Sequence, residues 1–383
     1  MKRLLLLSLA TMLSAGAFAQ QEYEKVEAPD SLRIYNDNVT HEVKYYTENN
    51  KSKKPKNIIF LIGDGTGLSQ ISAGLTANHG KLFLENFKHV GFSQTQSSDN
   101  YVTDSAAGGT ALSSGERTYN GAIGVDTNKK PLHSVLEVAD ENGKATGLVA
   151  TSCITHATPA SFIAHQPDRN MYEEIAGDFL KTDIDVFIGG GYEHFTKRKD
   201  GKDLTKDLEA KGYQVLTNMD DIVKVKEGKL AGLIAPVHTP AMPERGNMLP
   251  EATTTALNIL SQDKKGFFVM IEGSQIDWGG HANNTNEVCR EMLDFDESIG
   301  KALEFAAKDG ETLIIITADH ETGGMAITNG DMKTGEVEAK YITHHHTATM
   351  VPVFAFGPGA EQFTGIMKNS DIGKKLKELA AGN

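Results

Sequence analysis

Short apolar runs recur along the chain from Asn57 onward, and longer amphipathic stretches separate them. Each run is rich in β-branched or aromatic residues, which is typical of a strand covered on both faces. The pattern predicts six strands of a buried sheet. They are Ile58–Ile62, Thr146–Ala150, Val186–Ile188, Gly266–Ile271, Thr312–Thr317 and Pro352–Phe356.

The stretches between these runs have the apolar spacing of a helix face. The clearest example, at i, i+3, i+4 and i+7, consists of Leu132, Val135, Leu136 and Ala139. Gly143 supplies a C-terminal stop for this helix. The other predicted helices are Pro250–Leu260, Glu287–Ala307 and Asp371–Ala380.

Alternating strands and helices predict an α/β fold with three layers, α/β/α, around a mainly parallel central sheet. Two polar, glycine-bearing segments, 190–245 and 326–345, interrupt this alternation. We expect them to form small insertions over the face of the sheet that carries the site.

The N-terminus has the organisation of a secretory signal. Lys2 and Arg3 precede an apolar core, Leu4–Leu13, and Ala17–Ala19 forms a small-x-small cleavage site. The core is too short for a membrane anchor, and no later stretch reaches the roughly 18 apolar residues of a span. We therefore expect an exported protein, either periplasmic or secreted. The predicted segments are a signal peptide (1–19), an N-terminal arm (20–56) and one large domain (57–383).

The net charge bears on the partners that the protein can bind, and the cysteine content bears on whether it has a disulfide. The formal net charge is −13, and loss of Lys2 and Arg3 with the signal makes the mature chain still more acidic. Such a chain is a poor nucleic-acid binder, and an anionic substrate must be held by metals or arginine. Of the two cysteines, Cys153 ends a strand-like run and Cys289 lies in a helical one, which favours buried thiols over a disulfide.

Polar residues follow several predicted strands at the point where each strand ends. Asp64 closes the first strand, Glu272 closes the fourth, and Asp319 with His320 closes the fifth. Ligands of parallel sheets gather beyond these carboxyl ends. Asp64 alone fits a capping residue in a glycine turn equally well, but a glutamate ending a buried strand is costly unless it is paired or metal-bound. His156 and Thr158 follow the second strand by a short loop.

Ser105 lies in the run Thr103–Ala111, between Asp104 and the small residues Ala106-Ala107-Gly108-Gly109. The run predicts a nucleophile at a helix N-terminus, where free N–H groups and the helix dipole favour negative charge. The alternative is an ordinary helix-terminal serine. A serine beside metal ligands indicates phosphoryl transfer, because a metal-bound hydroxyl needs no histidine base.

Three further sets of residues are candidates for binding metal or phosphate, although each also has an ordinary structural interpretation. Asp277 and His281 are four residues apart, and the intervening Gly279 and Gly280 predict a ligand loop rather than a helix; a capping aspartate and a surface histidine are the alternative. We expect one ligand among the three consecutive histidines 344–346. Arg169 is a candidate bidentate clamp for phosphate oxygens, against the alternative of a solvated side chain.

Taken together, these residues resemble the alkaline phosphatase family over most of residues 57–365. The motifs that carry the resemblance are Asp104-Ser105-Ala106-Ala107, the segment from Glu272 to His281, and Asp319-His320-Glu321-Thr322-Gly323-Gly324. The resemblance implies two zinc ions and a third ion, usually magnesium. The first zinc would be held by Asp277, His281 and His346, the second by Asp64, Asp319 and His320, and the third ion by Asp64, Thr158 and Glu272 with His156 close by.

The resemblance also implies that Ser105 is phosphorylated, that Arg169 grips the phosphoryl group and that Asp104 orients the arginine. His156 stands where several bacterial members carry aspartate, and imidazole suits zinc or cobalt better than magnesium, so the identity of the third ion stays open. Trp278 stands where other members carry lysine or histidine, which should weaken retention of product phosphate.

The function implied is hydrolysis of small phosphate monoesters to inorganic phosphate by an exported enzyme whose catalytic domain is 57–383. A phosphodiesterase of the same superfamily and a non-catalytic phosphate- or metal-binding protein are the alternatives. A sulfatase is disfavoured, because Ser105 is not followed by the Pro and Arg of the sulfatase pattern. Monomer and homodimer both stay open.

Overall fold

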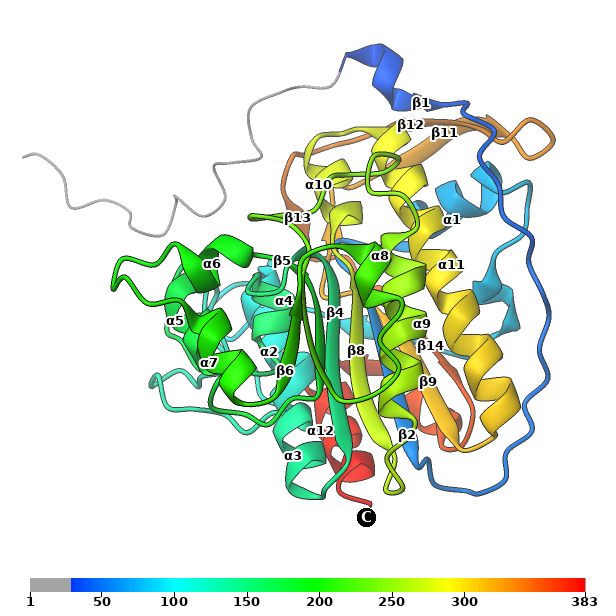
Figure 1. The fold of residues 1–383 in the computed structure, drawn as a ribbon. Helices are drawn as coiled ribbons and strands as arrows, with labels where there is room; N and C mark the ends of the chain where they lie inside the picture. The colour runs from blue at the N-terminus through cyan, green and yellow to red at the C-terminus, as the bar shows by residue number, and fades with distance from the viewer. Residues whose placement is uncertain (1–28, 383) are drawn as a thin grey trace, which may run out of the picture.

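The structure, a computed structural model, describes residues 29–382, so the predicted signal peptide lies outside the described residues (Figure 1). Its centre is a ten-stranded sheet of order β15-β3-β14-β9-β2-β8-β4-β5-β7-β6. All six predicted strands are confirmed within it. They are β2 (Asn57–Gly63), β4 (Ala145–Cys153), β5 (Val186–Gly190), β8 (Phe267–Gly273), β9 (Thr312–Thr317) and β14 (Val351–Phe356).

Four further strands complete the sheet: β3 (His89–Gln94), β6 (Tyr213–Leu216), β7 (Lys229–Leu233) and β15 (Gly365–Lys368). Only β14 pairs antiparallel with its neighbours in this described sheet, β3 and β9, whereas the other pairs are parallel. The carboxyl ends of β2, β8, β9 and β4 therefore meet at one edge, as the prediction of a mainly parallel sheet requires.

Helices cover both faces, because successive side chains of a strand point to opposite sides. In β2, Ile59 and Leu61 belong to one buried apolar cluster, and Ile58, Phe60 and Ile62 belong to the other. The helices packed on the first side are α1 (Leu68–Ala77), α8 (Met219–Ile222), α9 (Met248–Leu260), α10 (Gln275–His281) and α11 (Thr285–Asp309). Those on the second side are α2 (Ser105–Ser114), α3 (Val135–Glu141), α4 (Ala157–Ala160), α5 (Tyr172–Asp178), α6 (Tyr192–Thr196), α7 (Leu204–Ala210) and α12 (Asn369–Ala380). This confirms the three-layer α/β/α fold.

The predicted helix at residues 132–139 begins later than its apolar spacing suggests. Ser134 caps α3: its side chain accepts from Glu137 N, and Glu137 reaches back to the backbone of Ser134. This capping box satisfies two unpaired N–H groups and fixes the start of the helix at Val135. Apolar spacing therefore located the helix, and the cap set its first residue.

The expected insertions have different structures. The prediction for 190–245 was wrong in part, because β6 and β7 extend the central sheet from within this segment. Both strands are short and lie in a largely polar segment, so neither forms the long apolar run that predicts a strand. In the segment 326–345, β11 (Ala326–Asp331) and β12 (Glu336–Lys340) form a separate three-stranded sheet with β1 (Ile34–Tyr35). The chain then reaches β13 (His346–Thr347), which pairs with β10 (Glu321–Thr322).

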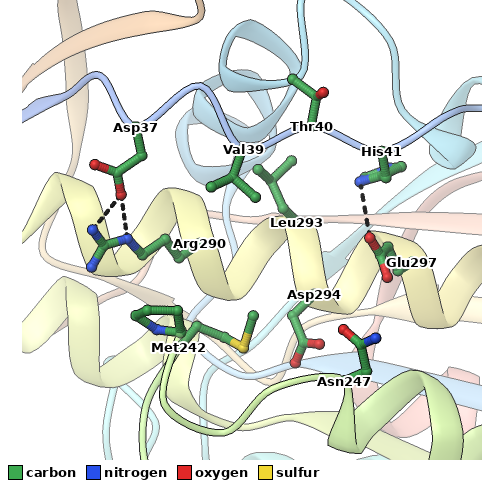
Figure 2. Close-up of a pocket in the computed structure, with 11 residues that line it drawn as sticks. Asp37, Val39, Thr40, His41, Met242, Asn247, Arg290, Leu293, Asp294 and Glu297 are labelled. Carbon is green, nitrogen blue, oxygen red and sulfur yellow. Dashed lines mark hydrogen bonds and ion pairs between the residues drawn. The ribbon is translucent and has the colours of Figure 1, made fainter.

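The chain from Asp37 to Asn50 has no helix or strand and runs along the outside of α11 (Figure 1). Side chains of the main body hold it: His41 Nε2 lies 2.7 Å from Asp296 Oδ2, and Asn86 Oδ1 accepts from Tyr46 N at 2.6 Å. A cavity of about 360 Å³ lies beneath this segment, where Asp37 pairs with Arg290 (Figure 2).

Both cysteines are buried and free, as predicted. Within residues 29–382, none of the helices combines the length and the apolar character that crossing a bilayer requires.

Candidate active site

Helix α2 holds Ser105 as its first residue. Asp104 caps the helix by accepting from Ala107 N at 2.9 Å, and all ten helical residues are buried. The small side chains allow this depth: a Cβ on Gly108 would lie 3.1 Å from Asp319 Cβ, and one on Gly109 would lie 3.0 Å from Ser161 Oγ. Ser105 therefore sits against the end of β9, at a helix N-terminus that favours an anion.

The sheet register aligns the strand ends that the sequence singled out. Ile62 of β2 lies opposite Glu272 of β8 and opposite Thr317 of β9, and Ala150 of β4 also lies opposite Glu272. Asp64, Asp319 and His320 follow these positions directly, and α4 after β4 carries Thr158. The structure brings together all of the strand-end candidates, and each of these four side chains is fully buried.

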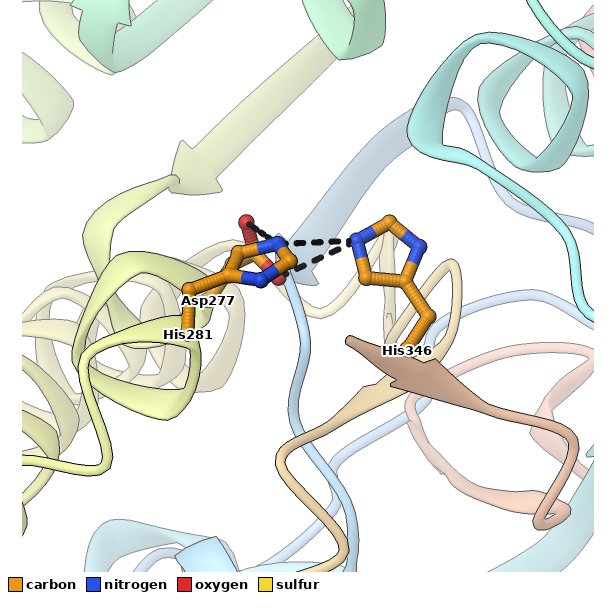
Figure 3. Close-up of side chains that lie close together, drawn as sticks. All are labelled: Asp277, His281 and His346. Atoms are coloured by element: carbon orange, nitrogen blue, oxygen red, sulfur yellow. Dashed lines mark hydrogen bonds and ion pairs between the residues drawn. The ribbon is translucent and has the colours of Figure 1, made fainter. Parts of the chain in front are cut away.

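The first cluster consists of Asp277, His281 and His346, whose ligand atoms lie within 4.8 Å of one another (Figure 3). His281 Nε2 lies 3.1 Å from His346 Nε2 and 3.4 Å from Asp277 Oδ2. The other nitrogens face backbone carbonyls: His281 Nδ1 lies 2.5 Å from His344 O, and His346 Nδ1 lies 2.9 Å from Thr103 O. Carbonyls only accept, so both Nδ1 atoms carry hydrogen and both Nε2 lone pairs face Asp277.

The prediction of a ligand loop at Asp277–His281 was wrong, because these residues belong to helix α10. The two glycines serve close packing rather than a turn. A Cβ on Gly279 would lie 2.8 Å from Val288 N, and a Cβ on Gly280 would lie 3.0 Å from Thr322 Cβ. The four-residue spacing of Asp277 and His281 is therefore a helical spacing that places both on one face.

The second cluster surrounds His320 beneath Ser105. Its Nε2 lies 3.2 Å from Ser105 Oγ, 3.2 Å from Asp319 Oδ2 and 3.4 Å from Asp64 Oδ1. The ligand atoms of Asp64, Asp277 and His320 also lie within 4.8 Å of one another, so Asp277 stands between the first two clusters.

The third cluster joins Asp64, His156 and Glu272. Thr158 Oγ1 lies 3.5 Å from Asp64 Oδ2, and Ser274 donates to Glu272 Oε2 at 2.7 Å. All four predicted residues of the third site thus lie around one point, with Asp64 shared between the second and third clusters.

The electrostatics of these clusters fit bound cations. Burial and the neighbouring Asp319 raise the pKa of Asp64 well above its usual range, and burial raises the pKa of Glu272 to about 8. Burial also opposes ionisation of Asp319, yet His320 holds its pKa below the ordinary value. Several buried atoms have no hydrogen-bond partner among the described residues: Asp64 Oδ1, His156 Nδ1, Glu272 Oε1 and Asp319 Oδ2. Close carboxylates and unpaired imidazole nitrogens are the donors that divalent zinc and similar metals bind.

Arg169 lines a cavity of about 550 Å³ together with Ser105, His156 and Trp278, and its Nη2 lies 3.4 Å from His156 Nε2. Its Nη1 donates to Asp104 Oδ2 at 3.0 Å. Burial alone would lower the pKa of Arg169, but Asp104 raises it above the ordinary value, so the guanidinium stays charged. The cavity therefore combines a hydroxyl, a fixed positive charge and three cation-ligand clusters.

Sequence reasoning missed three side chains that brace the site. Thr322 Oγ1 donates to Asp277 Oδ1 at 2.5 Å and lies 3.2 Å from His320 Nδ1. His238 packs edge-on against Trp278 and His156. His344 Nδ1 lies 2.9 Å from His281 O. Thr322 lies in the motif Asp319–Gly324 and His344 in the histidine run 344–346, so the sequence held a signal for both, whereas His238 reaches the site only through the fold.

The model of the family described as alkaline phosphatase matches residues 55–341. Alkaline phosphatase 4 of Bacillus subtilis is 35% identical over 96% of this chain and 95% of its own length. The alkaline phosphatase of Escherichia coli is 32% identical over 85% of this chain and 86% of its own.

Solved structures agree. The alkaline phosphatase from the Antarctic bacterium TAB5 is 45% identical, with a TM-score of 0.81 over 86% of this chain and 98% of that chain. A variant of the TAB5 enzyme with the same likeness has Mg bound in its M3 site. Sequence and fold thus agree over most of both chains, and this chain belongs to the alkaline phosphatase family and is a phosphoric monoester hydrolase.

Proposed function

We propose that the chain hydrolyses small phosphate monoesters through a phosphoserine at Ser105 and releases inorganic phosphate. The observation that carries the proposal is the place of Ser105 Oγ. It lies at a helix N-terminus, 3.2 Å from His320 Nε2, in the cavity that Arg169 also lines. A hydroxyl with cation ligands on one side and a guanidinium in the same cavity is suited to phosphoryl transfer.

The three clusters would hold two zinc ions and one magnesium. The first zinc would bind to Asp277, His281 and His346, and the second to Asp64, Asp319 and His320. The third ion would bind to Asp64, Thr158 and Glu272 beside His156. Magnesium in the TAB5 variant supports a cation at the third position, while the imidazole of His156 leaves zinc or cobalt open there. When bound, such ions lower the pKa of a hydroxyl or water and neutralise charge on the leaving oxygen.

The side chains of the protein carry the remaining roles. Ser105 Oγ loses its proton and forms a bond to phosphorus as the ester P–O bond breaks, and the leaving alkoxide takes up a proton to become the alcohol. Water then attacks the phosphoserine and gives up a proton, the bond to Oγ breaks, Oγ regains a proton, and phosphate leaves. Arg169 holds two phosphoryl oxygens throughout, and Asp104 keeps the guanidinium in place.

We further propose that residues 1–19 direct export to the periplasm or medium. The signal-like order of a basic start, an apolar core and a small-x-small site supports this. Residues 57–383 would then form the catalytic domain, preceded by the arm 20–56. Monomer and homodimer are both consistent with the proposal.

Ser105→Ala tests the nucleophile. The zinc- and magnesium-loaded wild type should cleave a nitrophenyl phosphate monoester far faster than the diester, and acid quenching with labelled substrate should trap a phosphoprotein. Ser105→Ala should lose the label and most turnover. Near-native turnover in the variant would exclude a serine nucleophile. Preference for the diester would indicate a phosphodiesterase, and metal binding without turnover would indicate a binding protein.

A further inference from the structure

The loop 342–346 brings His346 to the site, and a second histidine of this loop also contacts the metal-ligand helix. His344 is half-buried and belongs to none of the three ligand clusters. It lies beyond residues 55–341, which match the family model. Its contacts nevertheless join two segments that each supply a ligand to the first cluster.

His344 and His281 form a reciprocal pair. His344 Nδ1 donates to His281 O at 2.9 Å, and His281 Nδ1 donates to His344 O at 2.5 Å. Each imidazole is thus fixed in the tautomer with hydrogen on Nδ1, because a carbonyl can only accept. For His281 this leaves Nε2 with its lone pair toward His346 and Asp277.

Asn283 completes the contact between the loop and α10. It has a φ of 53°, in the left-handed region. Its amide is assigned from the hydrogen-bond network: Nδ2 then donates to Gly280 O at 3.0 Å and to Thr343 O at 2.9 Å, and Oδ1 lies 3.2 Å from His344 Nδ1. The last carbonyls of a helix lack intrahelical partners. Here His344 and Asn283 supply them at the end of α10.

The rest of the loop is attached elsewhere. Ile342 N donates to Gly323 O at 3.1 Å, and Gly323 N donates to His345 O at 3.0 Å. These backbone bonds hold the loop to the segment after β10 and do not involve the His344 side chain. Loss of that side chain should therefore leave the loop attached to the segment after β10. The separation of the loop from α10, however, would be less strictly fixed.

We propose that His344 is a positioning residue that sets the separation of His281 from His346, and so the zinc affinity of the first cluster. The inference rests on the proposed use of Asp277, His281 and His346 as zinc ligands. Partners that orient metal-ligating histidines typically change metal affinity by about 10–100-fold when they are removed. His344 acts through the loop and does not itself bind the ion.

The test is a zinc titration of the full-length, metal-stripped protein in competition with a chromophoric chelator. His344→Ala removes the donor. His344→Asn places an amide nitrogen near the position of Nδ1, whereas His344→Gln places it farther out. His133→Ala is the control, because it removes a partly exposed histidine that pairs with Glu141 and belongs to none of the three ligand clusters. Melting temperatures of the metal-free proteins check folding.

We expect one zinc-binding step to weaken about 10–100-fold in His344→Ala and His344→Gln. The zinc affinity of His344→Asn and His133→Ala should stay within a few-fold of the wild type. If His344→Ala does not fold, the zinc affinities of His344→Asn and His344→Gln decide whether His344 is a positioning residue. Equal zinc affinity in His344→Asn, His344→Gln and the wild type would overturn the positioning role of His344 but not the proposed metal centre. Absence of zinc binding in the wild type would overturn the proposed metal centre as well, so the two failures are distinguishable.

Discussion

Asp104→Asn is the sharpest test of how the enzyme holds phosphate. Asp104 accepts three hydrogen bonds: Oδ1 accepts from Ala107 N at 2.9 Å, and Oδ2 accepts from Gly121 N and from Arg169 Nη1, each at 3.0 Å. Asparagine has the same shape, and its Oδ1 can keep the helix cap. Its amide nitrogen, however, would face two donors, and the charge beside Arg169 would be lost.

The expected size of the effect follows from the exposure of this pair. A hydrogen bond to a charged group contributes about 1.5–3 kcal/mol. The side chains of Arg169 and Asp104 are 15% and 18% exposed, so solvent screens part of the interaction and the lower end of that range applies. About 1.5 kcal/mol corresponds to a roughly tenfold change in an equilibrium constant.

The assay is inhibition of nitrophenyl phosphate hydrolysis by inorganic phosphate. The inhibition constant should rise roughly tenfold in Asp104→Asn. Asp203→Asn is the control, because Asp203 is also an N-cap, accepting from Thr205 N at 3.1 Å at the start of α7, and has no part in the proposed site. Unchanged phosphate inhibition in Asp104→Asn, or an equal change in Asp203→Asn, would refute the role of Asp104 in orienting Arg169.

Two further predictions concern cations and pH. Removal of metals by a chelator should abolish hydrolysis, and zinc with magnesium should restore it; full activity in metal-stripped protein would contradict the proposed centre. Burial opposes protonation of His165, but its hydrogen bonds to Glu137 and Gly124 O raise its pKa above 6.5. Its stabilising contribution is therefore complete below pH 6.5 and is lost as pH rises through the folded pKa. Melting temperatures of wild type and His165→Gln should differ more at pH 5.5 than at pH 8.5, and an equal difference at both would disprove the assignment.

The sequence predicted the central strands because they are covered on both faces. Residues of β2 and β8 are buried throughout, so they form continuous apolar runs. The two edge strands, β6 and β15, were missed because they lack this signal. In β15, for example, Ile366 is 64% exposed, and the strand exists through its pairing with β3.

The candidate site could also be predicted in part, namely where its residues follow buried strands. Candidates at strand ends could be found from sequence, because parallel strands bring their carboxyl ends together. The helical structure of α10 could not be predicted from sequence, because Gly279 and Gly280 are typical of a turn. Their role is packing against Val288 and Thr322, which only the structure shows. His344 could not be chosen as a support rather than a ligand, because its role depends on a contact 63 residues away in sequence.

The burial of α2 has a consequence for how this enzyme can diverge. Every residue of the helix behind Ser105 is enclosed, so almost any larger side chain there must displace a neighbour. Four other residues that line the cavity are different: Asp99, Asn100, Asp168 and Asn170 are exposed residues of loops. Substitutions in these loops could therefore change which alcohol group the proposed site accepts, whereas α2 has little room for larger side chains.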